Sequence, residues 1–534
     1  MFVNVCRAWL GARAGDSDSV TIVARSLGGW PDFAKLHRMS VPLTGAMTGP
    51  HNVNLQAAAR QCMLEHGFHP DFSKAVQLEV DSLADRPPTP PQSPAAVDMR
   101  GLLWSSIDND TSRDLDQIEF AQDMGDGTVR VQIAIADVDA YVPAGSEIDQ
   151  HAAEQTTTVY TGVHNFSMLP DELSTGLTSL LEGQERLSVV YEFSVEDGCC
   201  VGTSNIYCAL VENRAQLAYT SVGAWLQSGE DAPAKVAASE ALRKQLSLQN
   251  RVAQLLRKER YRRGALNLET FETHPLVVNG QPVDIETQRR SLARDLIEDF
   301  MIAANEVVAK SLERAGFSSI RRVVKTPKRW DRIVELASQF GIKLPGTPEP
   351  KALHDFLCER RAADPDHFPD LSLAVVKLLG SGEYVLERVG ESAEGHFGLA
   401  VQDYTHSTAP NRRYADLVTQ RLLKAMLAKQ RSPYSDDDLA AIAQQCTRQE
   451  DAARKVEREM RKRIAAVVMR NRIGQTFTAI VTGVNEHGSF VRTTHPHVEG
   501  MLVRGQKGVD VGDKITVTLV HTDPERGYID FARS

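Results

Sequence analysis

The sequence predicts a multidomain α+β protein. In the central part of the chain, strand-like runs come early and helical patterns come later, which is typical of α+β domains. Short alternating runs return in residues 474–534 and favour a small β-barrel. With 534 residues, the chain is long enough for about three or four domains of ordinary size.

Residues 1–86 are expected to form a small, mostly helical module. Residues 54–67 and 72–83 have helical patterns, and a turn at His69-Pro70 separates them. Such a pair is compatible with a helix-turn-helix or winged-helix module, but the pattern is specific to neither.

The sequence on either side of these helices has little periodic pattern. The first forty or so residues look loosely organised, so Met39 or Met47 is a candidate start of the protein. Residues 87–97 form a proline-rich linker, which we expect to be stiff and exposed to solvent.

The central part, residues 98–473, begins with an acidic segment that places four carboxylates within nine residues: Asp108, Asp110, Asp114 and Asp116. Such close like charges repel one another unless divalent cations bind between them. Asp114 and Asp116 are two residues apart and so face the same side of an extended segment, and Asp108 can fold back to join them. A strand-like run follows at residues 129–136. A metal site and a solvated acidic turn both remain open at this point.

The last part of the chain, residues 474–534, is expected to be a closed or partly open barrel of five strands. The strand-like runs cover residues 477–484, 488–493, 500–503, 514–521 and 527–532.

Composition limits the class of protein. No apolar run is long enough to span a membrane, and the net charge is −10. The seven cysteines contain no CxxC pair, which fits a reducing cytoplasm and argues against a structural zinc site. We therefore expect a cytoplasmic, monomeric protein with no membrane contact.

Four segments, in order along the chain, resemble signatures of the ribonuclease II/R (RNB) family of processive 3′→5′ exoribonucleases. They are Ser106–Asp116 (SIDNDTSRDLD), Met168–Ser174 (MLPDELS), Leu296–Glu306 (LIEDFMIAANE) and Tyr404–Leu417 (YTHSTAPNRRYADL). The resemblance is to bacterial ribonuclease II, and it implies a catalytic domain with a mixed sheet surrounded by helices. The barrel resembles an S1-type RNA-binding domain of the OB class. The family usually carries two cold-shock barrels at the N-terminus, which this sequence does not show.

The resemblance implies a magnesium site. It assigns Asp108, Asp114, Asp116 and Gln117 as metal ligands, with Asp116 the acid most critical to cleavage. Two Mg²⁺ ions are implied, for which Mn²⁺ can substitute. The family commonly has an aspartate where this chain has Gln117, which brings an oxygen ligand but no charge. Asp110 is an additional acid, and a solvated loop position is the expectation for it.

Two further catalytic residues are implied by the resemblance. Arg412 corresponds to an arginine that braces the scissile phosphate, a role suited to a bidentate guanidinium. Glu457 aligns with an acid near the catalytic centre. Arg413 is placed among the RNA-binding residues, and it is also the expected ion-pair partner of Asp416.

RNA contacts are implied at four more positions. Tyr160 aligns with an aromatic that stacks on the 3′-terminal base, and Tyr219 aligns with one that sets where RNA leaves the channel. Glu298 is expected to hold the terminal ribose. In the barrel, Phe490 and Phe477 are candidates for stacking on bases, but either can belong to the barrel core instead.

A basic wall for this channel is also expected. Residues 411–472 contain fifteen Lys and Arg against eight Asp and Glu, a net charge of +7, and residues 454–472 read as a helix with one basic face. The implied function is Mg²⁺-dependent hydrolysis of single-stranded RNA to nucleoside 5′-monophosphates. Two alternatives remain: an RNA-binding regulator that has lost catalysis through Gln117, and an unrelated metal-dependent phosphodiesterase.

Overall fold

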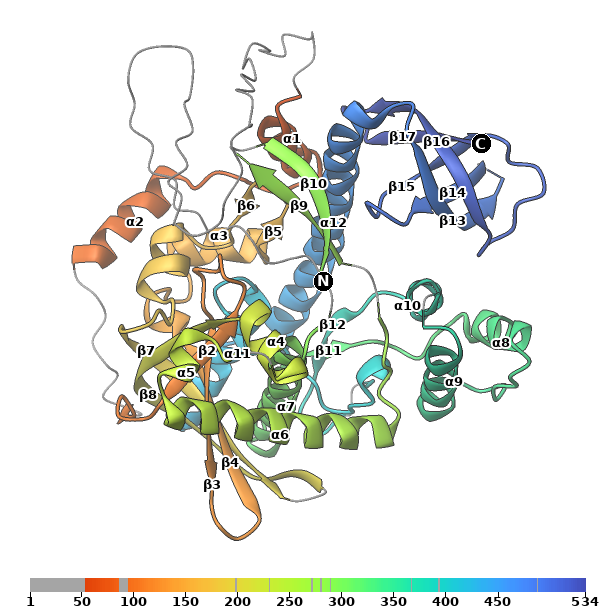
Figure 1. Cartoon of the computed structure of the whole chain (residues 1–534). Coiled ribbons are helices and arrows are strands. Elements are labelled where there is room, and N and C mark those ends of the chain that lie inside the picture. The colour runs from red at the N-terminus through yellow and green to blue at the C-terminus, as the bar shows by residue number, and fades with distance from the viewer. Residues whose placement is uncertain are drawn as a thin grey trace, which may run out of the picture. The chain divides into compact units, whose positions relative to one another are not determined.

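The computed structural model describes residues 53–85, 95–196, 199–229, 231–269, 272–278, 281–288, 290–365, 367–391, 394–486 and 488–534. Residues 54–534 form one compact unit. The loosely organised start predicted for residues 1–40, both candidate start methionines and most of the predicted linker lie outside the described residues. The predicted α+β fold is confirmed (Figure 1).

The centre of the structure is a six-stranded mixed sheet in the order β1-β8-β2-β3-β4-β7. β2 and β8 run parallel, whereas β3 is antiparallel to both β2 and β4. β7 pairs with β4 and also with the long β8, so the two sides of the sheet are joined. The strands are β1 (Val97–Asp98), β2 (Trp104–Asp108), β3 (Gln117–Asp123), β4 (Thr128–Ala136), β7 (Glu185–Glu196) and β8 (Cys199–Ala218). The strand predicted at residues 129–136 is β4.

Helices cover this sheet and complete its core. α6 (Glu240–Arg263) packs against β3 and β8, and α7 (Leu292–Arg314) packs against α6, β2, β7 and β8. The fully buried side chains of Trp104, Tyr191 and Phe300 belong to one continuous apolar core shared by sheet and helices. Two further helices close it, α11 (Tyr414–Leu427) and α12 (Asp436–Met469).

α12 is the longest helix, with 34 residues, and includes most of the basic helix predicted at residues 454–472. It begins at a capping box, in which the Ser435 hydroxyl accepts from the Asp438 amide and the Asp438 carboxylate accepts from the Ser435 amide. Its length lets it contact both the catalytic region and the C-terminal barrel.

Smaller elements connect these layers. They are η1 (Val138–Ala140), α3 (Glu147–Gln155), β5 (Val159–Tyr160), β6 (Asn165–Phe166), the π-helical turn η2 (Glu172–Leu177), α4 (Tyr219–Ser228), α5 (Ala234–Ala237), β9 (Glu272–Val278), β10 (Gln281–Gln288), η3 (Phe397–Leu399) and η4 (Arg470–Arg472). β9 and β10 form an antiparallel pair beside α12 (Figure 1).

A satellite group of helices has its own apolar cluster around Trp330, Phe356 and Phe368. Its helices are α8 (Trp330–Gln339), α9 (Pro350–Ala363) and α10 (Phe368–Leu379), and the two-stranded sheet of β11 (Ser319–Val323) and β12 (Glu383–Glu387) joins it to the centre. Gly264, which ends α6 with φ +101°, lies against the start of α9, where a Cβ would be only 2.7 Å from the Lys351 amide nitrogen. Only glycine fits this junction.

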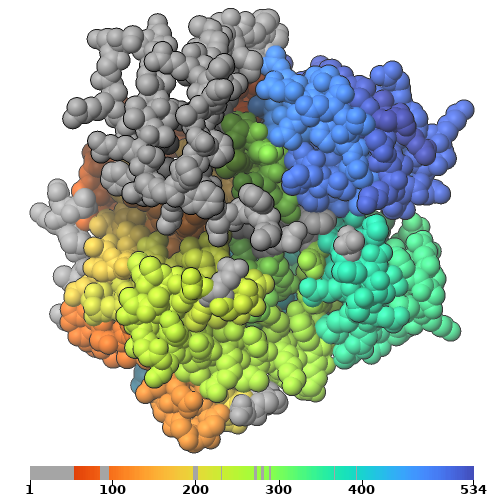
Figure 2. Space-filling model, in the orientation of Figure 1, coloured from red at the N-terminus to blue at the C-terminus, as the bar shows by residue number. Residues whose placement is uncertain are grey.

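The C-terminal part forms the predicted barrel of five strands, closed in the order β13-β14-β15-β17-β16. The strands are β13 (Thr476–Asn485), β14 (Gly488–Thr493), β15 (Glu499–Arg504), β16 (Lys514–Asp523) and β17 (Tyr528–Arg533). Figure 2 shows the barrel in blue next to the satellite helices in green and teal, and an ion pair of 2.7 Å joins Arg492 of β14 to Asp370 of α10.

Two helices precede the sheet, close to their predicted positions: α1 (Leu55–Glu65) and α2 (Lys74–Asp85). Asn54 caps α1 by accepting from the Ala57 amide. α1 packs against α12, and α2 packs against α3 with Val76 and Val80 in the central core. No helix among the described residues is both long enough and apolar enough to cross a bilayer.

Candidate active site

The acidic segment lies between β2 and β3. Asp108 ends β2 and accepts hydrogen bonds from the Asn109 amide, at 2.6 Å, and the Ser112 hydroxyl, at 2.9 Å. Asp114 is half-buried in the connecting loop, Asp116 is 2% exposed, and Gln117 opens β3. Asp110 is exposed in the same loop. Asp114 and Asp116 are therefore both withdrawn from the surface of the segment that joins β2 to β3.

A second predicted segment holds this loop in place. The Ser179 hydroxyl accepts from the Leu115 amide and donates to the Arg113 carbonyl, and the Leu180 amide donates to the Leu115 carbonyl. These residues follow the π-helical turn η2, which continues the Met168–Ser174 signature. The residues just after the Met168–Ser174 signature thus fix the backbone of the segment that carries the acids.

The Tyr404–Leu417 signature supplies the cation beside Asp116. The Arg412 Nε donates to Oδ2 of Asp116 at 3.0 Å, and the Asn411 amide donates to Oδ1 at 3.1 Å. Burial raises the pKa of Asp116 to about 6; the positive charge of Arg412 opposes this shift, and the negative charge of Asp114 adds to it. Burial also raises the pKa of Asp114.

These residues face a cavity of 740 Å³. Its walls come from the acidic loop, the β5–β6 turn, the start of α4, the β9–β10 pair, α7, α12 and the segment before α11. Eight of the predicted site residues line it: Asp108, Asp114, Asp116, Gln117, Tyr160, Tyr219, Arg412 and Glu457. Segments spread over the whole central domain therefore converge on one space.

Tyr160 and Glu457 form one side of the cavity. The Tyr160 amide donates to Oε1 of Glu457 at 3.1 Å, which joins β5 to α12. The Tyr160 side chain is 41% exposed to the cavity, and desolvation there raises its pKa to about 12. Burial raises the pKa of Glu457 as well, whereas its hydrogen bond from Tyr160 lowers it. The hydrogen bond from the Tyr160 amide to Glu457 thus fixes the backbone that carries the Tyr160 ring at the cavity.

Tyr219 and Arg294 form the opposite side. The guanidinium carbon of Arg294 lies 4.6 Å from the centre of the Tyr219 ring, and its Nη2 donates to the Asn109 side chain at 2.8 Å. Sequence reasoning did not single out Arg294, although it lies two residues before the Leu296–Glu306 signature. It ties the aromatic residue to the acidic loop.

Glu119 is the second residue that sequence reasoning missed. It lies on β3 two residues after Gln117, so both side chains point to the same side of the strand. Glu119 is fully buried, and neither carboxylate oxygen has a hydrogen-bond partner among the described residues. Burial, followed by the charge of Asp108, raises the pKa of Glu119 well above its ordinary value. An unpartnered buried acid close to Asp108 is costly unless a cation or proton compensates it.

Three predicted residues are not among the described residues that line the cavity: Glu298, Arg413 and Phe490. Glu298 pairs with Arg290 at 3.2 Å. Arg413 makes the predicted ion pair with Asp416, with N–O distances of 2.7 and 2.8 Å. Phe490 is half-buried on β14, between the buried Ser489 and Val491, and so faces away from the barrel core. Phe477 packs against that core, with its ring 6.3 Å from the ring of Phe531.

The donors in the cavity fit a hard divalent cation. Three carboxylates and the Gln117 amide supply oxygen ligands, which Mg²⁺ prefers. Glu119 is a further buried carboxylate nearby, but it is not among the described residues that line the cavity. The carboxylates of the acidic loop are not gathered around one point among the described residues.

Comparison with known families agrees with this site. Residues 96–429 match the RNB domain, and residues 475–534 match the RNase II-type exonuclease C-terminal S1 domain. Ribonuclease R of Thermotoga maritima is 30% identical over 473 residues, which cover 81% of this chain and 64% of that protein. Ribonuclease R of Escherichia coli K12 is 30% identical over 448 residues, which cover 81% and 54%. The chain thus spans between half and two thirds of the length of these relatives.

Solved structures share the fold. Apo Mycoplasma genitalium RNase R is similar with a TM-score of 0.79 and 23% identity, covering 91% of this chain and 79% of that one. Yeast Ssd1, described as a pseudonuclease, is similar with a TM-score of 0.66 and 16% identity, covering 87% and 57%. The RNB domain match extends over more than half of the chain and includes the acidic loop and Arg412. The chain therefore belongs to the RNB family, and its C-terminal barrel is an S1 domain of the RNase II type.

Proposed function

We propose that this chain is a processive 3′→5′ exoribonuclease that degrades single-stranded RNA to nucleoside 5′-monophosphates with Mg²⁺. One observation carries the proposal: side chains with oxygen donors, the arginine Arg412 and the two aromatic rings of Tyr160 and Tyr219 line a single cavity. These groups are the ones that hydrolysis of a stacked nucleotide requires. The ribonuclease R names of relatives at 30% identity support the reaction class.

Asp108, Asp114, Asp116 and Gln117 would hold the Mg²⁺, and Mn²⁺ satisfies the same ligands. When bound, Mg²⁺ polarises the phosphate ester and lowers the barrier to attack by water. We assign to Glu119 the negative charge that Gln117 does not supply, because its carboxylate is buried close to Asp108 with no partner among the described residues. This assignment makes the absence of the usual fourth aspartate compatible with activity.

Arg412 would clamp the scissile phosphate. Its contact with Asp116 uses Nε, and 44% of its side chain remains exposed on the cavity side. Burial disfavours the charged guanidinium, but the charges of Asp116, Tyr160 and Asp114, together with the hydrogen bond to Asp116, outweigh it and raise the pKa of Arg412. Arg412 therefore stays charged while it stabilises the negative charge that develops on the phosphate.

Tyr160 would stack on the 3′-terminal base, and Glu457 would act as a positioning residue that holds the Tyr160 backbone. Tyr219, braced by Arg294, would contact the RNA on the other side of the acidic loop.

Phe490 remains a proposed stacking residue of the S1 barrel. Because the Arg413 guanidinium is paired with Asp416, we propose that Arg413 stabilises the start of α11 rather than contacting RNA directly. We assign no role in the cavity to Glu298, which is paired with Arg290.

We further propose that the protein acts as a monomer in the cytoplasm. The cysteines found at Cys62, Cys208, Cys358 and Cys446 are free thiols, which fits a reducing compartment.

The regulator hypothesis rests on the similarity to the pseudonuclease Ssd1 and on Gln117. End-labelled single-stranded RNA and DNA of the same sequence, each with Mg²⁺ and with EDTA, separate the alternatives. An RNA exonuclease shortens only the RNA and only with Mg²⁺. A regulator binds the RNA and leaves it intact, and an unrelated phosphodiesterase cleaves both strands.

A further inference from the structure

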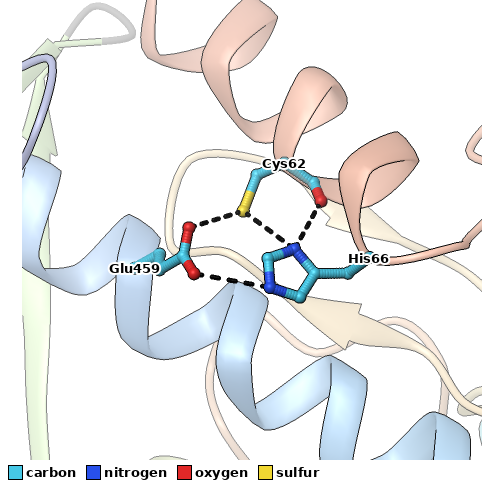
Figure 3. Close-up of side chains that lie close together, drawn as sticks. All are labelled: Cys62, His66 and Glu459. Atoms are coloured by element: carbon cyan, nitrogen blue, oxygen red, sulfur yellow. Dashed lines mark hydrogen bonds and ion pairs between the residues drawn. The ribbon is translucent and has the colours of Figure 1, made fainter.

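A second group of metal-ligating side chains lies away from the cavity, where α1 packs against α12 (Figure 3). Cys62 and His66 are one helical turn apart at the end of α1, and Glu459 lies on α12. Among the described residues, this is the one group of three or more His, Cys, Asp or Glu whose ligand atoms all lie within 4.8 Å of one another.

Two of the separations are close to those around a single ion, although they end on different oxygens of Glu459, and the Cys62 Sγ also lies 3.8 Å from the His66 Nδ1. The Cys62 Sγ lies 3.5 Å from Oε2 of Glu459, and the His66 Nε2 lies 3.4 Å from Oε1. Tetrahedral zinc sites with Zn–S and Zn–N or Zn–O bonds of ordinary length separate sulfur from oxygen by about 3.5 Å and nitrogen from oxygen by about 3.3 Å. The Glu459 carboxylate thus presents one oxygen to each of the two partners.

The orientation of His66 favours a ligand role. Its Nδ1 lies 3.0 Å from the Cys62 carbonyl oxygen, which can only accept, so Nδ1 carries a hydrogen. Nε2 is therefore the atom left to face Glu459, and at 3.4 Å it lies beyond an ordinary charge-assisted hydrogen bond. Metal-bound histidines commonly donate their other ring N–H to a backbone carbonyl in this way.

The charges of the three side chains suit a dication. Cys62 is fully buried, and burial followed by the charge of Glu459 raises the pKa of its thiol to about 12. A bound dication reverses this preference, since it favours the thiolate and releases the thiol proton. One thiolate and one carboxylate then balance the two positive charges, while Arg463 and Glu65 nearby oppose each other in sign.

We propose that Cys62, His66 and Glu459 bind one Zn²⁺, with water as the fourth ligand, and that this ion clamps α1 to α12. A thiolate and an imidazole select a borderline-soft ion such as Zn²⁺ over Mg²⁺, which distinguishes this site from the oxygen-lined cavity. The clamp lies one half-turn from Glu457, which supports Tyr160 at the cavity. Zinc would therefore stabilise the helix that carries one wall of the active site.

The test uses the full chain with saturating Mg²⁺ to fill the acidic cavity. Zn²⁺ affinity and stoichiometry are measured by competition with a chromophoric chelator, and Co²⁺ is added separately to look for thiolate-to-metal charge-transfer absorption. We expect one tightly bound Zn²⁺ per chain, a charge-transfer band with Co²⁺, and at least a hundredfold weaker binding in Cys62→Ser. Glu459→Gln should weaken binding by about tenfold or more.

Cys358→Ser is the matched control. The Cys358 Sγ also lies near a histidine one helical turn away, 3.4 Å from the His354 Nε2, but it has no third ligand grouped with it among the described residues. It should keep the full zinc affinity. No bound Zn²⁺ and no charge-transfer band in the unmodified chain would overturn the proposal and leave a hydrogen-bonded trio. Equal zinc affinity in Cys62→Ser and Cys358→Ser would also overturn the proposal. The absorption measurement on the unmodified chain decides the question even if a variant fails to fold.

Discussion

Arg412 donates from Nε to Oδ2 of Asp116 at 3.0 Å, although 296 residues separate the two in sequence. The contact joins the segment before α11 to the acidic loop and places a permanent cation beside Asp116, the most buried of the four predicted metal ligands. The amide of the preceding residue, Asn411, occupies the other oxygen of the same carboxylate. Arg412, which we propose to bind the phosphate, is thus positioned by Asp116, which we propose to bind the metal.

Asp116→Asn should remove cleavage while leaving RNA binding close to that of the unmodified chain. The amide cannot supply the charge that positions the cation in the transition state, so we expect the single-turnover rate to fall on the order of 10³-fold or more. Asp110→Asn is the matched control, because Asp110 is exposed and lies in the same loop. Equal losses in both variants, or parallel loss of RNA binding in Asp116→Asn, would contradict the assignment.

Glu119→Gln should raise the Mg²⁺ concentration required for half-maximal activity by about tenfold, because it removes the buried carboxyl that we propose to ionise when a cation binds near Asp108. Adding Gln117→Asp to the same variant should restore much of the Mg²⁺ affinity, since it returns a carboxylate to the neighbouring position on the same side of β3. An unchanged Mg²⁺ dependence in a folded Glu119→Gln protein would show that Glu119 serves packing alone.

Tyr160→Ala should weaken binding of the RNA 3′ end by about 1–3 kcal/mol, the usual value of one aromatic–base stack. Tyr160→Phe keeps the ring and the backbone hydrogen bond to Glu457, so it should bind nearly as well as the unmodified chain. Affinities are measured with a short RNA in EDTA, which prevents cleavage. If Phe and Ala weaken binding equally, the hydroxyl rather than the ring makes the contact.

The free energy of unfolding should fall as the pH is lowered from about 7 to 5. Burial, with the charge of Arg322 adding to it, lowers the pKa of His396 from 6.5 to about 4. Between these values the unfolded chain binds the proton more readily than the folded chain, so acid favours unfolding, by up to about 3 kcal/mol in total for this residue. The buried His406, whose pKa is lowered well below its ordinary value, acts in the same direction.

His396→Asn tests this pH dependence. Asparagine can still accept from the Leu399 amide, which now donates to the His396 Nδ1 at 3.1 Å, but it does not titrate. Denaturant unfolding at several pH values should give a shallower slope for the variant. An unchanged slope would assign the acid sensitivity to other groups.

Most of the residues that line the cavity and were predicted from the sequence belong to short motifs, in which the residues needed for the chemistry are close together along the chain. The acids of the 106–117 loop and Arg412 stand in dense, distinctive motifs, and the structure brings these motifs to one cavity. Local patterns were also sufficient for the five barrel strands and for α1 and α2, since alternation and helical periodicity depend on neighbouring residues.

What the sequence did not reveal depends on contacts between distant segments. Glu119 looks like an ordinary polar position of a strand, and it is buried because α6 and the neighbouring strands cover it. Glu298 is paired with Arg290 and is not among the described residues that line the cavity, a pairing that sequence patterns do not show, and its contact with the ribose stays a prediction. The Cys62–His66–Glu459 group joins residues 397 positions apart, so no spacing rule for zinc ligands could have found it.

The most direct test of the central claim is a time course with single-stranded RNA labelled at its 5′ end, in Mg²⁺ and in EDTA, with the released nucleotides identified separately. The account predicts Mg²⁺-dependent shortening from the 3′ end to a short product, with nucleoside 5′-monophosphates released from the start. Intact RNA in every sample, together with measurable RNA binding, would contradict it and favour an RNA-binding regulator.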